Sequence, residues 1–237
     1  MIHEVFRDSY IGLLNMNKVA LIIGAGPGLS LSFAKELVSA GYTVALASRD
    51  MEKLKPLALS IGAQAFKVDA SSIDDIQKLF YFVENAWGEP EVVLYNPSAR
   101  VKGDILSLNP NKVSEALQTT AMGAFATAQE AAKRMIPRNH GAIFFTGATA
   151  SIKGFAGSSG FAMGKFAVRG LAQCLARELS PQGIHVAHFV IDGSVKSDPV
   201  NDAMTAEAIA KTYMAILNQP KAAWTWEIEI RSKDEHF

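Results

Sequence analysis

Residues 19–50 read VALIIGAGPGLSLSFAKELVSAGYTVALASRD and indicate the fold more strongly than any other stretch of the chain. An apolar run at 19–23 leads into a glycine-rich turn at 24–28. A helical pattern at 29–40 and a second apolar run at 43–48 follow. A buried strand, a tight turn, a helix and another buried strand are typical of a βαβ unit, in which the two strands are parallel.

The same alternation continues along the rest of the chain. We predict further strands at 65–68, 91–96, 142–146, 184–191 and 226–230, and further helices at 51–61, 72–87, 109–137, 159–179 and 205–217. Apolar strands separated by helices must be covered on both faces, and right-handed crossovers place the helices there. We therefore predict an α/β fold with a doubly wound parallel sheet of about seven strands.

The chain shows no linker, low-complexity tract or internal repeat after Lys18, so we predict one domain over residues 18–237. Residues 1–17 precede the patterned part, and Met16 lies just before its start. Charged residues interrupt any apolar core that a secretory signal would need there. We interpret residues 1–17 as an N-terminal extension, added upstream of an alternative start at Met16.

Composition limits the classes of function. The chain has 237 residues, 49% of them hydrophobic, with 23 Lys and Arg against 23 Asp and Glu. Zero net charge argues against nucleic-acid binding, and the lack of any long apolar run argues against a membrane span. A single cysteine, Cys174, fits a reducing compartment and lies in an apolar helical context that predicts a small core residue. We predict a cytoplasmic protein and no metal site.

The glycine-rich turn has the features of a phosphate-binding loop. Gly24, Gly26 and Gly28 would let backbone N–H groups approach a pyrophosphate, and the helix beginning at Leu29 would attract its charge. The spacing is not G-x-G-x-x-G, because Leu29 stands where that pattern has its last glycine; Gly24-x-x-x-Gly28 with the small Ser30 two residues later fits a different dinucleotide pattern. The alternative is a glycine-rich turn that binds no ligand.

The end of the second strand indicates which dinucleotide would bind. An acidic residue about 20 positions after the glycines would hold the ribose of NAD. Ser48 and Arg49 stand there instead, and a hydroxyl and a guanidinium suit the 2′-phosphate of NADP(H). In the alternative interpretation, Arg49 is an exposed charge paired with its neighbour Asp50.

From Lys18 to about Gly193 the chain resembles the short-chain dehydrogenase/reductase family, which has a Rossmann-type fold. Besides the segment quoted above, the resemblance is carried by VVLYNPSA (92–99) and by GFAMGKFAVRGLAQCLARELSPQGIHVAHFVIDGSV (160–195). It implies a cofactor held by the residues from Gly24 to Leu29 and by Ser48 and Arg49. The other implied contacts are Asp69 at the adenine, Asn96, Lys165 and Gly193.

The same resemblance shows where the sequence departs from the family. The family's active-site Tyr-x-x-x-Lys is Phe161 to Lys165 here, its catalytic Ser is Ala148, and its helical Asn is Thr120. Only Lys165 matches. In the family the Tyr exchanges a proton with the substrate, the Lys lowers the pKa of that Tyr and binds the nicotinamide ribose, and the Ser orients the carbonyl. Phe161 and Ala148 can do none of this.

Other side chains near the predicted strand ends could supply a proton. Hydroxyls such as Thr149 are weak acids without a paired base. Asp192 could act if buried, but an Asp-Gly pair is typical of a turn. His188 has the pattern of a core histidine, facing the side of its strand opposite to His185. The Tyr95 phenol lies near the mouth of the site and could supply a proton, but a packing role for this side chain is at least an equal alternative.

These observations support two main functions. The first is an NADP(H)-dependent short-chain oxidoreductase with an altered catalytic site, acting on a small carbonyl or alcohol. The second is a catalytically impaired nucleotide-binding protein that works as a sensor or as an oligomer subunit. A sheet protein that binds no nucleotide is a third, weaker alternative. The resemblance also implies a homodimer or homotetramer assembled through the long helices.

Overall fold

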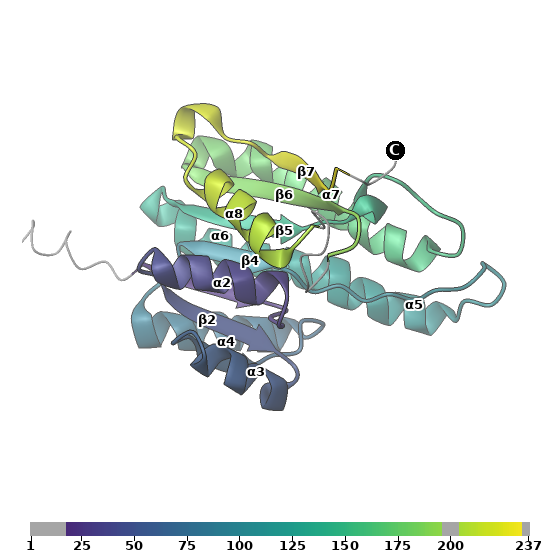
Figure 1. Ribbon diagram of the computed structural model, residues 1–237, viewed down its shortest axis with the longest axis horizontal. Helices are drawn as coiled ribbons and strands as arrows, with labels where there is room; N and C mark the ends of the chain where they lie inside the picture. Colours follow the sequence, from purple (N-terminus) through teal and green to yellow (C-terminus); the bar gives the residue numbers. More distant parts are fainter. Residues whose placement is uncertain (1–17, 196–203, 234–237) are drawn as a thin grey trace, which may run out of the picture.

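Seven parallel strands form one sheet in the part of this computed structural model that is described, residues 18–195 and 204–233 (Figure 1). The strands are β1 (Val19–Ile23), β2 (Thr43–Ser48), β3 (Gln64–Lys67), β4 (Val92–Tyr95), β5 (Gly141–Thr146), β6 (Ile184–Asp192) and β7 (Glu227–Arg231). Their order is β3-β2-β1-β4-β5-β6-β7, so successive strands extend the sheet to one side of β1 as far as β3 and to its other side from β4 onward. The predicted doubly wound, Rossmann-type sheet is confirmed. The predicted extension, residues 1–17, lies outside the described residues.

Helices cover both faces of the sheet (Figure 1). They are α2 (Leu29–Ser39), α3 (Met51–Leu59), α4 (Ile73–Trp87), α5 (Pro110–Leu117), α6 (Gly123–Met135), α7 (Ser159–Leu179) and α8 (Ala206–Leu217). One core lies between the sheet and α2, α3 and α8, and the other between the sheet and α4, α6 and α7. In β1, Leu21 belongs to one core and Ile22 to the other, which explains why the strand is apolar throughout.

The helix predicted at 109–137 is interrupted, which corrects our prediction. Its start is as predicted, with Asn109 as the N-cap and Pro110 at the first helical position. A π-helical segment, Gln118–Met122, then separates α5 from α6. After it, Gly123 packs so closely that a β-carbon there would lie 2.1 Å from the Ala70 carbonyl oxygen. Apolar periodicity does not report a single widened turn, so the sequence did not reveal it.

Cys174 is exposed, so the prediction of a small core residue is wrong. The apolar stripe that α7 turns toward the sheet contains Val168, Ala172 and Ala176. Cys174 lies two residues from Ala172, and a step of two residues in a helix turns about 200°, onto the opposite face. The apolar residues near Cys174 in the sequence therefore lie on both faces of α7, and their presence does not indicate that Cys174 is buried.

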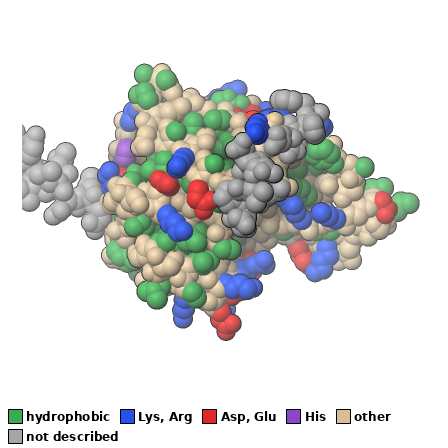
Figure 2. All heavy atoms as spheres, viewed as in Figure 1, with side chains coloured by type: hydrophobic (Ala, Val, Ile, Leu, Met, Phe, Trp, Pro, Cys, Tyr) green, Lys and Arg blue, Asp and Glu red, His purple; other side chains and the backbone are tan. Residues whose placement is uncertain are grey.

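The surface agrees with the balanced charge of the sequence. Figure 2 shows Lys and Arg side chains interspersed with Asp and Glu side chains on the face that it presents. Within residues 18–195 and 204–233, no helix is long and apolar enough to cross a membrane.

Two histidines of β6 are buried on opposite faces of the sheet, as the strand periodicity predicts. His188 Nδ1 lies 2.9 Å from Glu227 Oε2, and Arg169 donates two hydrogen bonds to the same carboxylate. On the other face, the His185 ring stacks on Trp224 with the two ring planes 6° apart. His188 is thus a core residue held by an ion-paired glutamate on β7.

Burial lowers the pKa of His188 from its ordinary 6.5 to about 4, although Glu227 opposes that shift. Unfolding exposes the ring, so between pH 6.5 and 4 the unfolded chain binds more protons than the folded one. We therefore expect the free energy of unfolding to fall as the pH falls through that window. Urea unfolding at several pH values would show a flatter slope in His188→Asn. An unchanged slope in this variant would contradict the assignment to His188.

Candidate nucleotide-binding and active site

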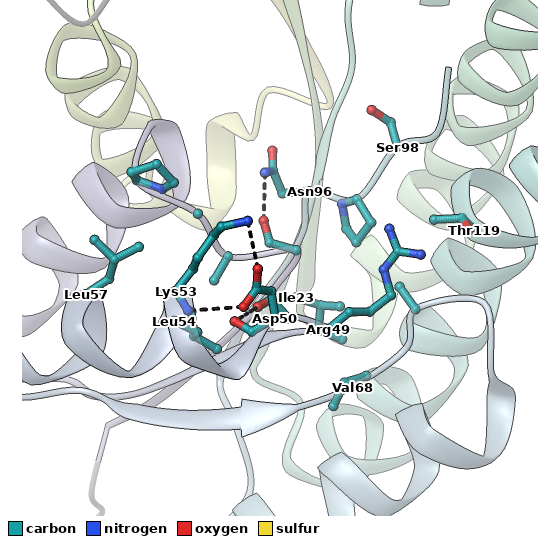
Figure 3. A pocket seen from close by; sticks show the side chains of 17 residues that line it. Ile23, Arg49, Asp50, Lys53, Leu54, Leu57, Val68, Asn96, Ser98 and Thr119 are labelled. Carbon is teal, nitrogen blue, oxygen red and sulfur yellow. Dashed lines mark hydrogen bonds and ion pairs between the residues drawn. The ribbon is translucent and has the colours of Figure 1, made fainter. Parts of the chain in front are cut away.

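A cavity of about 490 Å³ opens at the carboxyl ends of β1, β2 and β4 (Figure 3). The glycine-rich turn forms one side of it, and Ser48, Arg49 and Asn96 line it as well. The position is the point where the strand order reverses, and doubly wound sheets bind their ligands there. The structure therefore brings the predicted phosphate loop and the residues at the end of the second strand to one cavity.

The turn has the backbone geometry of a phosphate loop. Gly24 has a φ of +79°, and a β-carbon there would lie 2.6 Å from the Pro97 nitrogen. Around Gly26 and Gly28 the space is open, so backbone N–H groups are approachable. Gly28 is the N-cap of α2 and supplies no side-chain cap to the first turn. Those N–H groups and the helix dipole remain available to a phosphate.

Ser30, which departs from the family's third glycine, is part of the loop's internal support. It is buried, and its hydroxyl donates to the Gly24 carbonyl oxygen over 3.2 Å. The Asn96 amide donates both to that carbonyl, over 3.1 Å, and to Ser30 Oγ, over 2.9 Å. Asn96 at the end of β4 thereby fixes the loop after β1, and Ser30 is compatible with an intact cradle.

Arg49 does not pair with Asp50. The Asp50 carboxylate accepts from the backbone N–H of Lys53 at the start of α3 and forms an ion pair of 2.8 Å with the ammonium group of Lys53. Figure 3 shows the Arg49 side chain extending toward Thr119, away from this pair. Arg49 is exposed and lines the cavity, so the alternative interpretation of a paired surface charge does not describe it.

Asp69 lies beside Arg49 in a neighbouring cavity of about 320 Å³. Hydrogen bonds from the Ser71 backbone and hydroxyl lower the pKa of the Asp69 carboxyl group, and the charge of Arg49 lowers it further. Asp69 is therefore an ionised acceptor on the rim next to the main cavity rather than inside it.

A third cavity, of about 460 Å³, adjoins the 490 Å³ cavity at Asn96 and Ser98. Leu29, Gly193 and Lys165 line it. Lys165 is 3% exposed, and its ammonium group donates to the Thr146 carbonyl oxygen over 2.7 Å. Burial, with a smaller effect of the nearby Arg100 charge, lowers the pKa of Lys165 to about 8. The buried cation lies at the floor of the site.

Phe161 and Ala148 line the same cavity as Lys165, whereas Thr120 is not among its lining residues. Phe161 lies one turn before Lys165 on α7, and the guanidinium of Arg100 stands 4.5 Å above its ring. Thr120, in the π-helical segment, is buried and accepts a hydrogen bond from the Ala99 N–H. Three of the four tetrad positions thus come together, and the fourth supports the adjacent loop.

The substitute proton donors considered above have other partners. Asp192 ends β6, where its carboxylate accepts from the Thr149 hydroxyl and forms an ion pair of 3.2 Å with Arg231. It is a paired, buried acid, and Gly193, which follows it at the end of the strand, has a φ of +128°. The hydroxyl of Tyr95 donates to the Thr119 carbonyl oxygen, as a packing role requires.

Sequence reasoning missed Arg100, which lines the cavity with Lys165. Its position, four residues after Asn96 in a loop, carries no periodic signal. The only available indication was that Arg100 follows the carboxyl end of a strand, where sites in this architecture gather.

The comparisons with known proteins agree with this geometry. Residues 18–230 match the family model described as short chain dehydrogenase. Carbonyl reductase family member 4 of Xenopus tropicalis is 28% identical over 184 residues, which are 77% of this chain and 78% of that protein. The human 3-oxoacyl-[acyl-carrier-protein] reductase is 26% identical over 189 residues, 79% of each.

Solved structures show the same likeness. A short-chain dehydrogenase from Rhodopseudomonas palustris is 35% identical, with a TM-score of 0.82 over 91% of this chain and 98% of that one. A metagenomic short-chain oxidoreductase solved with NADP shares the fold at 24% identity, with a TM-score of 0.82 over 90% of this chain and 96% of the other. The chain belongs to the short-chain dehydrogenase family, a family of NAD(P)-dependent oxidoreductases.

Proposed function

We propose that this protein is an NADP(H)-dependent oxidoreductase that acts on a small carbonyl or alcohol through an altered catalytic site. The observation that carries the proposal is the continuity of two cavities, one lined by the glycine turn and Arg49, the other by Lys165. They share Asn96 and Ser98, so one extended dinucleotide would reach from Arg49 to Lys165. The relatives named as reductases support the class of reaction.

Each end of this site suits one part of the cofactor. The N-terminus of α2, together with Gly26 and Gly28, would hold the pyrophosphate, and Arg49 with Ser48 would hold the 2′-phosphate. Asp69 lies beside Arg49, where the adenine end would be, and Gly193 lies in the cavity of Lys165. When bound, NADPH supplies the hydride.

Of the four tetrad positions, Lys165 alone has an ionisable side chain; Thr120 has a hydroxyl but is not among the residues that line this cavity. A buried ammonium with a pKa of about 8 holds its proton at neutral pH and releases it more readily than an ordinary lysine. A general acid works best when its pKa lies near the working pH. Lys165 Nζ is therefore the group that would donate the proton to a reacting oxygen in this cavity, with Phe161 shielding it from water.

A second function, nucleotide binding without hydride chemistry, is favoured by two contacts. Lys165 Nζ already donates to the Thr146 carbonyl oxygen, and Arg100 covers the ring of Phe161. In such a protein the same residues would fix the bound nucleotide for a sensor or an oligomer subunit.

Two measurements on the full chain decide between these functions. NADPH fluorescence titration tests the cradle, and absence of binding would overturn both functions. Steady-state oxidation of NADPH over a panel of small carbonyl compounds tests the reaction. Binding without turnover of any compound would leave the pseudoenzyme function standing and reject the oxidoreductase.

We also propose a homodimer or homotetramer, because α6 and α7 expose large apolar side chains. Phe125 is 47% exposed and Phe166 is 43% exposed. We expect sedimentation of the wild type at two or four times the monomer mass and of Phe125→Glu/Phe166→Glu as a monomer, since charges in an apolar interface are costly. The control Tyr81→Glu, on α4, should leave the assembly intact. A monomeric wild type would contradict the proposal.

The lone thiol bears on the compartment. An exposed Cys174 with no second cysteine to pair with fits the reducing cytoplasm, which we propose as the location.

A further inference from the structure

A fourth, smaller cavity of about 240 Å³ lies against the cavity of Lys165. The residues that line both cavities form the boundary between them, and they are Arg100, Ala148, Phe161, Ile191 and Gly193. The smaller cavity continues past that boundary to Lys102, Thr149 and Phe155. It is the side of the site away from the glycine turn, and its volume suits a small molecule next to the cofactor.

Positive charge surrounds this cavity. Arg100 and Lys102 line it, and Lys165 stands behind the Phe161 boundary. A further cation, Lys153, stands 5.6 Å from the centre of the Phe155 ring, which also lines the cavity. Arg100 is close enough to Lys165 to contribute to the lowered pKa of that lysine. Like charges gathered at a cavity, each disfavouring the other, are relieved when an anion binds between them.

No carboxylate among the described lining residues offsets these cations. The residues that line the two cavities, within 18–195 and 204–233, include no Asp or Glu. Two acids of the described part of the chain have other partners: Asp104 accepts from the backbone N–H groups of Leu106 and Ser107, and Asp192 accepts from the Thr149 hydroxyl and is paired with Arg231. In the described structure no carboxylate lies within ion-pair distance of Arg100.

Phe161 gives Arg100 a defined orientation. The guanidinium lies 4.5 Å above the ring centre, where a cation–π contact holds it. A guanidinium held on one face keeps its N–H donors directed along its edge, where a carboxylate or phosphate binds in a bidentate manner. A phenol hydroxyl is not needed for this role, so Phe161 serves as a platform.

From this arrangement we infer that the cavity beyond Lys165 selects a carbonyl substrate that carries an anionic group, a carboxylate or a phosphate, bound by Arg100 with Lys102 at the rim. The inference rests on the proposed oxidoreductase function, because it names the substrate class of the same site. It gives Phe161, which cannot transfer a proton, a positioning role through Arg100.

The test is calorimetric titration of the full chain saturated with NADP⁺, in which no reduction can occur. The probes are acetoacetate, dihydroxyacetone phosphate, and neutral acetoacetamide, which matches acetoacetate in shape. We expect one or both anions to bind at least about tenfold more tightly than acetoacetamide, as a charge-assisted bidentate contact provides. The stronger anion identifies the group as a carboxylate or a phosphate.

Variants assign the selectivity to Arg100. Arg100→Gln should weaken binding of the favoured anion about 10- to 100-fold and leave acetoacetamide unchanged. Arg100→Lys should bind the favoured anion with an affinity between those of the wild type and Arg100→Gln, because lysine keeps the charge but cannot form the bidentate contact of a guanidinium. Arg177→Gln, an exposed arginine at the other end of α7, is the matched control and should match wild type.

Three results would overturn the inference: neither anion binding more tightly than acetoacetamide, no binding of either anion, or an Arg100→Gln effect on the NADPH dissociation constant as large as on the anion. The last would assign Arg100 to the cofactor. Failure of the proposed oxidoreductase looks different, because NADPH would then bind without turnover of any carbonyl compound, while the anions still bound more tightly than acetoacetamide to the chain saturated with NADP⁺.

Discussion

Phe161→Tyr is expected to raise the rate of NADPH-dependent carbonyl reduction by about 10²- to 10⁴-fold, the usual contribution of a positioned general acid. The new hydroxyl would lie on the ring that already lines the cavity, one helical turn from Lys165. Two cations, the Lys165 ammonium and the Arg100 guanidinium, would favour the phenolate and lower the pKa of the new phenol. Steady-state kinetics over a panel of neutral carbonyl compounds would measure the gain.

A matched control separates position from chemistry. Phe155→Tyr adds the same hydroxyl to a ring that lines only the smaller cavity, away from Lys165. We expect no gain in that variant. A gain limited to Phe161→Tyr would show that the bound cofactor and the carbonyl compound are both placed within reach of the ring at position 161. If Phe161→Tyr gains nothing while NADPH still binds, the carbonyl does not reach this ring.

The architecture could be predicted from the sequence because its periodicities are long and mutually consistent. Each of the strands β1, β2 and β4 is an apolar run, and the glycine turn after β1 marks the switch point. Local signals of this kind depend on one strand or helix at a time. They therefore remain readable without knowledge of what packs against them.

What the sequence did not reveal depends on contacts between distant segments. The π-helical turn accommodates the close approach of Gly123 to Ala70 and Tyr95, which belong to other parts of the chain. The pairing of Asp192 with Arg231 joins β6 to the end of β7. The Arg100 guanidinium is oriented by the ring of Phe161, which lies some sixty positions later in the chain. No single-segment pattern encodes such partners.

The same distinction applies at Arg49, where sequence chemistry left two interpretations open. Its neighbour Asp50 could have neutralised it, and adjacency in sequence made that pairing reasonable. The structure assigns Asp50 to the start of α3 and to Lys53 instead. The start of α3 needs the Asp50 carboxylate as its N-cap. Lys53, three residues later, lies on the face of the helix where its ammonium group can pair with that carboxylate. Arg49 is left directed along the cavity.

Arg49→Ala is accordingly expected to weaken NADPH binding by about 10- to 100-fold, because charge-assisted hydrogen bonds to a phosphate are worth about 1.5–3 kcal/mol. NADH lacks the 2′-phosphate, so its dissociation constant should change little. Parallel fluorescence titrations with the two cofactors would give the ratio, and Arg177→Ala would report any general effect of losing one positive charge. An equal loss for NADH and NADPH would mean that Arg49 contacts a part common to both cofactors, such as the adenine. A loss confined to NADPH would show that the Arg49 side chain sets the preference for NADPH over NADH. Lys53, which pairs with the Asp50 cap of α3, would then have no part in that preference.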